Sequence, residues 1–446
     1  MKQFIKHKGI KWSVFVLFSL TLSWSFGQVP TPTQQVHKRL LLQNGTAHIG
    51  NGEMIRNASI AIEEGKILFV RNALTYQLDE SEWDTIISLK GKHVYPGFIA
   101  ANLTIGLTEI DAVRATRDFR ETGSINPNVR ALIAYNTDSK VMYTIRTNGV
   151  LVTQSTPRGG LISGTSSVMA LDGWNWEDAV YKADDGVHLN WPQKHQSTGW
   201  WAEPGKSQVN KKYKETTTRI YAFFEEAAAY VKSRSPEKMQ LKMEAMRGVM
   251  DGSQRLFIHA DFAPEMNDII DFSRQFKFEH TVIVGGYDAD IIAERLKENN
   301  IAIMLGRPHS LPKFEDDLTY ATFHKAKRLQ QAGVEYCIQA AGSMEVMNAR
   351  NIPFLAGTAW SYGLTEEEAV ASVSLNVARI LGVDDIIGSL EKGKDATLFV
   401  SDGNALEMRT NNVSMAMVKG NFIVLDNHQM ELSRKYHERY GLKGGE

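Results

Sequence analysis

The stretch VYPGFIAANLTIGL, Val94–Leu107, contains a run of small and apolar residues about as long as one β-strand. Continuous apolar strands are typical of a sheet that is buried on both faces. Six further runs of this kind follow along the chain: GVLVTQS from Gly149, SSVMAL from Ser166, RLFIHA from Arg255, TVIVGG from Thr281, IAIMLG from Ile301 and VEYCIQ from Val334. Amphipathic helical stretches accompany most of them, which predicts an α/β fold with a parallel sheet. Seven candidate strands are close to the eight of a (β/α)8 barrel.

Short strands separated by glycine-containing turns lie at both ends of the chain. Residues 39–70 have the pattern of a half-exposed antiparallel sheet, and a matching pattern returns in GSLEKGKDATLFVSD and VSMAMVKGNFIVLD. These separated segments predict one composite β-sandwich domain built from both termini. The predicted boundaries are 39–93 and 386–430 for the β-sandwich, 94–385 for the barrel and 431–446 for a C-terminal tail. Residues 171–252 are too long for a simple connection and are expected to form a helical excursion over the barrel mouth.

Residues 1–27 have the pattern of a secretory signal peptide. Lysines precede the apolar run WSVFVLFSLTLSWSF, and the small residues Ser25 and Gly27 frame a cleavage site before Gln28. The run is shorter than the roughly 20 residues that a spanning helix needs, so cleavage is favoured over an uncleaved anchor. Residues 28–38 then form a linker. We expect an exported, periplasmic protein with no stable membrane span after cleavage.

The composition limits the classes of partner. The 446 residues carry a formal net charge of -1, and lysine and arginine are scattered, which argues against nucleic acid or an anionic membrane as a partner. A small-molecule substrate or a protein partner remains. The single cysteine, Cys337, excludes an intrachain disulfide, and its apolar neighbours favour a packed thiol over a nucleophile.

Two motifs connect these segments to a known family. Pro96-Gly97-Phe98-Ile99 opens the barrel, and GSLEKGKDA, Gly388–Ala396, reopens the β domain. With the split β domain, this arrangement resembles the amidohydrolase superfamily in its imidazolonepropionase-like branch, and within it the exported amidohydrolase-like proteins of Bacteroidetes. The resemblance covers residues 39–425 and departs from the family at Thr397, where aspartate is usual. It implies a distorted (β/α)8 barrel with a metal site at the C-terminal ends of its strands.

The resemblance also implies where metal ligands would lie. In the family, one barrel strand supplies a His-x-His pair, because residues two apart on a strand point to the same side. Asn102 and Thr104 occupy these positions, and neither side chain replaces imidazole as a zinc ligand. His259 matches the fifth-strand ligand, or is a hydrogen-bonded histidine of the barrel rim. Gly285-Gly286 and Ala340–Gly342 stand where the family has a histidine and an aspartate. The expected cofactor is therefore a divalent metal such as zinc, held by His259, Asn102 and Thr104, or none.

Other side chains could serve a site at the barrel mouth. Asp261 and Glu265 follow the strand of His259 and are candidates for a catalytic base. In TPRGGLISGTSSVM, the glycines let backbone amides approach a ligand, and Arg158, Ser163 and Thr165 are candidates for binding an oxyanion or a carboxylate. A tight turn between the second and third strands accounts for the same pattern.

No further metal-binding pattern is present in the sequence: HExxH and paired CxxC are absent, and His188 and His195 lie in a segment without a helical pattern. A hydrolytic zinc site needs about three protein ligands and an open position. Two functions therefore stay open. One is a metal-dependent hydrolase of non-peptide carbon–nitrogen bonds. The other is a pseudoenzyme that uses the barrel as a binding or scaffold subunit, paired with a homologous, metal-competent barrel or forming an oligomer.

Overall fold

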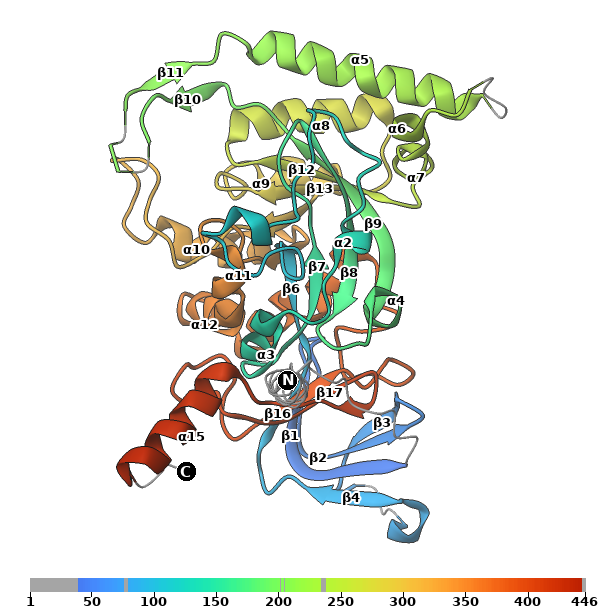
Figure 1. Ribbon diagram of the computed structural model, residues 1–446, viewed down its shortest axis with the longest axis vertical. Helices are drawn as coiled ribbons and strands as arrows, with labels where there is room; N and C mark the ends of the chain where they lie inside the picture. The colour runs from blue at the N-terminus through green and yellow to red at the C-terminus, as the bar shows by residue number, and fades with distance from the viewer. Residues whose placement is uncertain (1–38, 76–78, 201, 204, 234–237, 443–446) are drawn as a thin grey trace, which may run out of the picture. The chain divides into compact units, whose positions relative to one another are not determined.

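The computed structural model describes residues 39–75, 79–200, 202–203, 205–233 and 238–442 (Figure 1). The predicted signal peptide, 1–27, and the linker, 28–38, lie outside the described residues. Among the helices of the described residues, none is both long enough and apolar enough to cross a membrane. Two eight-stranded sheets and one two-stranded ribbon organise the described chain.

The first eight-stranded sheet curves into a nearly closed barrel with the order β15-β14-β13-β12-β9-β8-β7-β6. Its strands are β6 (Phe98–Leu103), β7 (Val150–Ser155), β8 (Ile162–Ala170), β9 (Val180–Asn190), β12 (Arg255–Ala260), β13 (Thr281–Gly285), β14 (Ala302–Leu305) and β15 (Tyr336–Ile338). The barrel prediction is confirmed. The expectation of a wholly parallel sheet is wrong at β8, which runs antiparallel to both β7 and β9. The short loop between β7 and β8 leaves no room for a crossover helix, so the chain turns back on itself.

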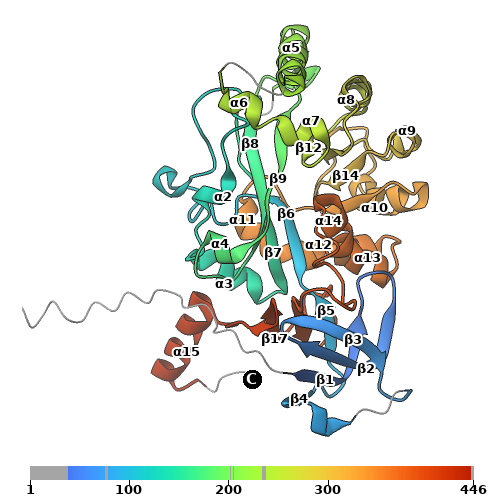
Figure 2. The same ribbon diagram turned by 90° about the vertical axis from the view of Figure 1, so that its right-hand side faces the viewer.

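Helices cover the outer face of the barrel sheet. Figure 2 shows α8, α9 and α10 along one side of the molecule, each following a barrel strand. On α8, Met266, Ile269 and Ile270 are buried at the three- and four-residue spacing that places side chains on one helix face. The helices are α2 (Ala131–Ala134), α3 (Lys140–Arg146), α4 (Trp176–Ala179), α5 (Tyr213–Lys232), α6 (Leu241–Glu244), α7 (Arg247–Asp251), α8 (Ala263–Phe276), α9 (Ala293–Glu298), α10 (Ala321–Ala332), α11 (Glu345–Asn348), α12 (Ile352–Ser361), α13 (Glu366–Ser372), α14 (Leu375–Leu381) and α15 (His428–Tyr440).

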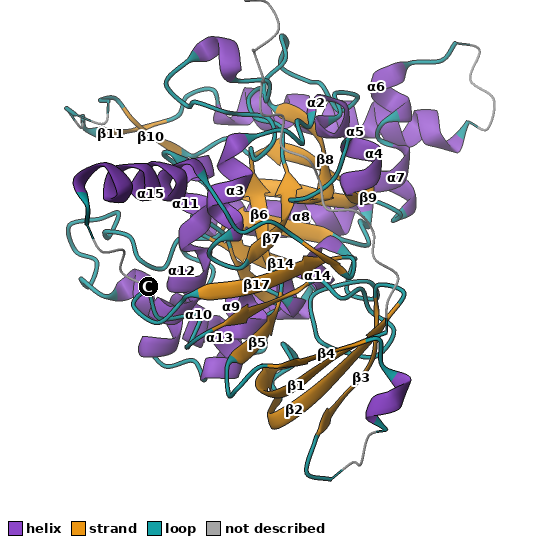
Figure 3. Cartoon of the chain, turned by 60° about the horizontal axis from the view of Figure 1, so that its bottom comes forward, coloured by secondary structure: helices purple, strands orange, loops and turns teal. Residues whose placement is uncertain are grey.

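The second eight-stranded sheet is the composite β domain. Its order is β18-β17-β16-β5-β1-β2-β3, with β4 paired to β1. Its strands are β1 (Leu40–His48), β2 (Met54–Glu63), β3 (Lys66–Asn72), β4 (Thr85–Ser88), β5 (His93–Pro96), β16 (Leu398–Ser401), β17 (Val413–Val418) and β18 (Asn421–Phe422). The antiparallel pairing of β16 with β5 joins the two ends of the chain. Ile60, Val94, Leu398 and Met417 share one hydrophobic core, so both halves of the sheet enclose the same interior (Figure 3).

The segment 171–252 supplies a barrel strand before it becomes helical. β9 lies between β8 and β12 and is the eighth strand that the apolar runs did not reveal. Asp184, Asp185 and Gly186 interrupt its apolar pattern, and Asp184 has a left-handed φ of 51°. The ribbon β10 (His195–Ser197) and β11 (Ser207–Val209) and helices α5 to α7 follow. The segment is therefore part of the barrel wall as well as a helical excursion.

The predicted tail, 431–446, is largely helix α15 where the structure describes it. None of the residues of α15 is buried.

Candidate functional site

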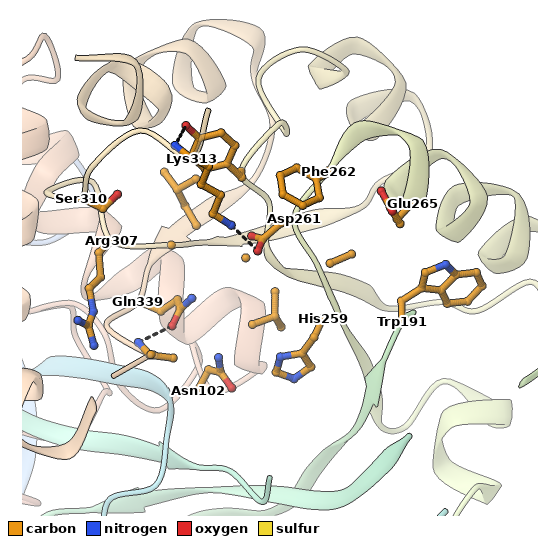
Figure 4. Close-up of a pocket in the computed structure, with 18 of the residues that line it drawn as sticks. Asn102, Trp191, His259, Asp261, Phe262, Glu265, Arg307, Ser310, Lys313 and Gln339 are labelled. Carbon is orange, nitrogen blue, oxygen red and sulfur yellow. Dashed lines mark hydrogen bonds and ion pairs between the residues drawn. The ribbon is translucent and has the colours of Figure 1, made fainter. Parts of the chain in front are cut away.

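A cavity of about 620 Å³ opens at the C-terminal ends of the barrel strands (Figure 4). Barrels of this class place their chemistry at this end. Its walls come mainly from residues at or just beyond the ends of β9, β12, β13, β14 and β15, together with Asn102 of β6. Polar residues of the wall include His259, Asp261, Glu265, Arg307, Lys313 and Gln339. A cavity of this size suits a small molecule.

Two histidines, the barrel pair His188 and His259, meet on neighbouring strands. His188 of β9 lies opposite Phe257 of β12, and His259 is two residues further along β12, so the three side chains share one face of the sheet. His188 Nδ1 lies 3.0 Å from His259 Nε2. The rings of His188 and Phe257 stack with centroids 4.7 Å apart. The second nitrogen of His188, Nε2, lies 2.9 Å from Ser166 Oγ. Each ring is thus held by a hydrogen bond and a packed neighbour.

A buried hydrogen-bond network extends from the barrel pair to Asn102. Ser166 Oγ donates to Asp185 Oδ1 at 2.7 Å, and Gln154 Nε2 donates to Asp185 Oδ2 at 2.7 Å. Gln154 Oε1 in turn accepts from the backbone N–H of Asn102 at 3.0 Å. Burial raises the pKa of Asp185 to about 6, although the hydrogen bonds from Ser166 and Gln154 oppose this shift. The network positions the first-strand residue and the barrel pair relative to each other.

The Arg158 guanidinium lies close to the barrel pair. It donates to Asn102 Oδ1 at 2.8 Å and to the Asn102 carbonyl oxygen at 2.6 Å, and it forms a 3.0 Å ion pair with Glu345. Burial and, to a smaller extent, the charge of Arg158 lower the pKa of His259 to about 3. Burial, His259 and Arg158 also lower the pKa of His188 well below its usual value. Both imidazoles are therefore neutral at neutral pH, beside a fixed organic cation.

The two predicted base candidates lie in the cavity wall in different surroundings. Asp261 forms a 2.6 Å ion pair with Lys313. Glu265 is buried, and one of its oxygens accepts a hydrogen bond from the backbone N–H of Lys194. Its other oxygen, Oε2, is buried with no hydrogen-bond partner among the described residues. Figure 4 shows Glu265 and Trp191 on the side of the cavity away from Arg307. The catalytic role of both carboxylates stays a prediction.

The other predicted site residues are held by the protein itself. Ser163 Oγ accepts from Asn190 Nδ2 at 2.9 Å, beside the cavity. Thr165 donates to the Pro127 carbonyl oxygen at 2.8 Å and does not line the cavity. Thr104 is buried but does not line the cavity. The left-handed φ of 53° at Asn102 and the register shift beside it break the alternation expected for positions 102 and 104.

In the predicted ligand loop, close packing against residue Ser124 explains why position 160 is a glycine. Gly160 has a φ of 68°, and a Cβ there would lie 2.9 Å from the Ser124 carbonyl oxygen. The backbone N–H groups of Leu161 and Ile162 both donate to this same oxygen. The loop is therefore shaped by the segment that it packs against.

Comparisons with known proteins agree with this architecture. The family model described as "Amidohydrolase family" matches residues 258–423. A crystal structure of an amidohydrolase from Thermotoga maritima MSB8 is similar, with a TM-score of 0.74 and 23% sequence identity, over 86% of this chain and 99% of that one. Residues 258–423 are therefore similar in sequence to the amidohydrolase family, and the chain as a whole has the fold of an amidohydrolase.

Two further proteins are similar to this chain, one in sequence and one in structure. Amidohydrolase tasK of Hapsidospora irregularis is 26% identical over 172 residues, which are 37% of this chain and 17% of that protein, so the match spans about a sixth of this curated relative. An adenosine deaminase from Xanthomonas campestris with bound zinc has a TM-score of 0.52 and 14% identity, over 90% of this chain and 98% of that one. The structural likeness supports the fold, and neither likeness identifies the reaction of this chain.

The donor set at this barrel mouth does not fit a superfamily zinc site. Of the three predicted ligands, Asn102 Oδ1 accepts from Arg158, Thr104 does not line the cavity, and His259 Nε2 is hydrogen-bonded to His188. In the part of the chain that the structure describes, no three histidine, cysteine or acidic side chains gather closely enough at the mouth to hold a metal ion. A guanidinium beside the imidazoles would also repel a divalent cation. The side chains at this mouth therefore do not form a zinc site.

Several residues of this site could not be recognised from the sequence, among them Arg307 and Lys313 of the cavity wall. His188 and Asp185 lie on the unrecognised strand β9, and Glu345 follows β15 at a position with no strand pattern. His188 carried a signal, since it lies between the apolar residues Val187 and Leu189, but only the strand register brings it to His259.

Proposed function

We propose that the barrel mouth binds a small carboxylate-bearing molecule without metal-dependent hydrolysis, as a pseudoenzyme of the superfamily. The observation that carries this proposal is the Arg307 guanidinium, which lines the cavity just beyond β14 and has no hydrogen bond to a carboxylate among the described residues. It supplies a permanent positive charge in the cavity wall, whereas Arg158 is paired with Glu345 and is not among the lining residues. A fixed guanidinium can orient an anion, whereas it cannot deliver a deprotonated water as a metal does.

The chemistry of the wall indicates the ligand class. Arg307 donates to the carbonyl oxygens of Ala340 and Ser343, and none of its hydrogen bonds within the described residues reaches a carboxylate. Half-buried guanidinium groups of this kind bind carboxylates through charge-assisted hydrogen bonds. Phe262 and Leu305 line the same cavity and provide apolar contact. A small acid with an apolar side chain fits these surroundings.

Isothermal titration of the full chain with N-acetyl-L-methionine tests the proposal. A similar solved structure, a Xaa-Pro dipeptidase, has methionine bound in its active site, which makes this probe a reasonable start. The uncharged methyl ester is the matched control ligand. We expect the acid to bind about 10-fold more tightly or better, since hydrogen bonds to charged groups contribute about 1.5–3 kcal/mol. Equal affinity for acid and ester would contradict the carboxylate assignment.

A variant comparison locates the binding. Arg307→Gln is expected to remove most of the preference for the acid, and Arg434→Gln on the exposed helix α15 should leave it unchanged. A preference for the acid that survives in Arg307→Gln would show that the probe binds elsewhere.

The rival function is hydrolysis, and the barrel pair is the observation that favours it, because imidazoles are frequent zinc ligands. The same protein incubated with N-acetyl-L-methionine and added Zn²⁺ would then release acetate, and His259→Gln would abolish the release. We expect no acetate above the level of the His259→Gln variant.

We further propose that the protein is exported and works beside a homologous, metal-competent barrel. The lysine-rich start followed by an apolar run supports export, and the ligand substitutions at the mouth support the partner. N-terminal sequencing of the mature protein and co-purification from the native host test the two parts separately. A mature chain that still begins at Met1 would contradict cleavage before Gln28.

A further inference from the structure

A second histidine-containing cluster lies outside the barrel mouth. The junction cluster consists of His48 at the end of β1, His93 at the start of β5, and Glu366 and Glu367 in the first turn of α13. These residues come from distant parts of the chain. Figure 3 shows α13 next to β5, where a barrel helix meets the β domain. From this cluster we infer a divalent transition-metal site of the zinc class.

The geometry of the donors supports this assignment. His48, Glu366 and Glu367 each offer one ligand atom, and these atoms all lie within 4.8 Å of one another. Donor atoms around a tetrahedral zinc ion lie about 3.3 Å apart, given metal–ligand bonds of about 2.0 Å. The glutamate side chains have three rotatable bonds and can cover this difference. One imidazole and two carboxylates are a donor set that suits zinc, whereas magnesium prefers oxygen ligands only.

The imidazole of His48 is fixed in the orientation that a ligand needs. His48 is 1% exposed, its ring stacks on Tyr95 with centroids 4.2 Å apart, and Nδ1 lies 2.6 Å from Glu367 Oε1. The other nitrogen, Nε2, lies 2.9 Å from His93 Nδ1. In metal sites the non-coordinating ring nitrogen is commonly held by such a partner, which fixes the ring and its tautomer. His93 would serve as this positioning residue, while Nδ1 of His48 faces the carboxylates.

The carboxylates lack the partners that would otherwise neutralise them. Within the described residues, neither Glu366 nor Glu367 forms an ion pair with lysine or arginine, and the single ion pair of Glu367 is with His48. Glu367 Oε2 is buried and accepts no hydrogen bond from the described chain. Glu366 Oε1 accepts from Asn404 Nδ2 at 2.6 Å, which orients it. The first turn of a helix favours acidic residues but does not require a buried, unpartnered oxygen. A bound cation accounts for both carboxylates at once.

The position of the junction cluster indicates that a metal ion bound there would stabilise the fold. It joins β1 and β5 of the β domain to α13 of the barrel, in a chain whose single cysteine excludes an intrachain disulfide. A metal held by both parts stabilises the folded state by its binding free energy. The proposed ion is therefore structural, and it is independent of the ligand proposed for the barrel mouth.

Titration of the chelator-treated full chain with Zn²⁺ tests this inference. We expect one tightly bound Zn²⁺ per chain, no comparable binding of Mg²⁺, and a higher midpoint of thermal unfolding in the presence of Zn²⁺. In the double variant Glu366→Gln/Glu367→Gln, the Zn²⁺ affinity should fall at least 100-fold and the thermal shift should disappear. His93→Asn should cause a smaller loss, about 10-fold, as expected when the partner of a ligand is removed.

The matched control is His259→Gln at the barrel mouth, which should keep the full Zn²⁺ affinity and stoichiometry. Absence of Zn²⁺ binding to the wild-type chain, or binding that survives in the Glu366→Gln/Glu367→Gln variant, would overturn the site. If Zn²⁺ binding is instead lost in His259→Gln, both the junction site and the metal-free mouth proposed above are wrong. The two histidines of α15, neither of them buried, remain in all variants, so weak binding there does not affect the comparison.

Discussion

The barrel pair and the histidines of the junction cluster are chemically alike and differ in what surrounds them. In each pair one ring nitrogen faces another across 3.0 Å or 2.9 Å. The barrel pair lies beside the Arg158 guanidinium, whereas the junction histidines lie beside two carboxylates without a lysine or arginine partner in the described chain.

This difference indicates that the charge around a buried histidine decides whether its imidazole can bind a metal ion or only forms hydrogen bonds. A buried imidazole next to a guanidinium stays neutral and serves as a hydrogen-bonding group, because adding either a proton or a metal ion there meets repulsion. A buried imidazole next to carboxylates offers a cation two negative charges and a lone pair. Two histidines alone are therefore insufficient evidence of a metal site in this fold.

Among the variants considered, removal of the Asp185 carboxylate, which Ser166 connects to His188, should reduce the stability most. Asp185→Ala leaves Gln154 Nε2 and the Ser166 hydroxyl without their buried acceptor. We expect the free energy of unfolding to fall by about 3 kcal/mol or more, since a buried polar group left unpaired costs about 1–3 kcal/mol. Urea denaturation measures this loss. Asp118→Ala, at an exposed position, should change the stability by less than about 0.5 kcal/mol. A similarly small effect at Asp185 would mean that the network adds no stability.

The barrel pair should also make folding stability depend on pH. The pKa of His259 in the folded state is lowered to about 3 from an ordinary value of 6.5. Its stabilising contribution is therefore complete above about pH 6.5 and is lost as the pH falls toward 3, because only the unfolded chain takes up the proton. Between pH 7.5 and 5 the loss is about 2 kcal/mol for this histidine alone.

Asp185 acts in the opposite direction. Its pKa is raised to about 6, so its contribution is present below about pH 4 and is lost as the pH rises through 6. Urea denaturation at pH 7.5 and at pH 5 should therefore show a shallower pH dependence in His259→Gln than in the wild-type chain. Equal slopes would show that His259 is not held neutral by the fold.

Arg158→Gln tests the cause of the contrast between the two pairs. Removing the guanidinium should raise the pKa of both barrel imidazoles, because its charge is one of the causes that lower them. Burial is the larger cause, so their pKa values should stay below 6.5. Nuclear magnetic resonance titration of the histidine ring protons measures the change. A pKa that does not move would place Arg158 too far away to influence the pair, and the junction histidines provide the internal control.

Local patterns in the sequence predicted most of the fold and little of the site. Apolar runs and turn dipeptides are local signals, so the barrel sheet and the composite β domain could be predicted. β9 could not, because its aspartates and glycine break the pattern while the neighbouring strands still hold it in register. The site depends on contacts between distant residues: Arg158 and Glu345 are 187 positions apart, and His48 and Glu367 are 319 apart. A single sequence gives no sign of such pairs.

Lys313→Met should have the smallest effect on the free energy of unfolding. It should nevertheless lower the affinity for the ligand of the cavity. The Lys313–Asp261 ion pair is about one-third exposed on both sides, and pairs of this kind contribute about 0–1 kcal/mol. Its loss should therefore change the free energy of unfolding by less than about 1 kcal/mol. In the cavity, however, the ammonium group contributes positive charge near the proposed carboxylate site (Figure 4). Affinity for N-acetyl-L-methionine should fall several-fold in the variant, measured by isothermal titration, while affinity for the methyl ester should not change. If both ligands weaken together, Lys313 shapes the cavity and its charge plays no part in recognition.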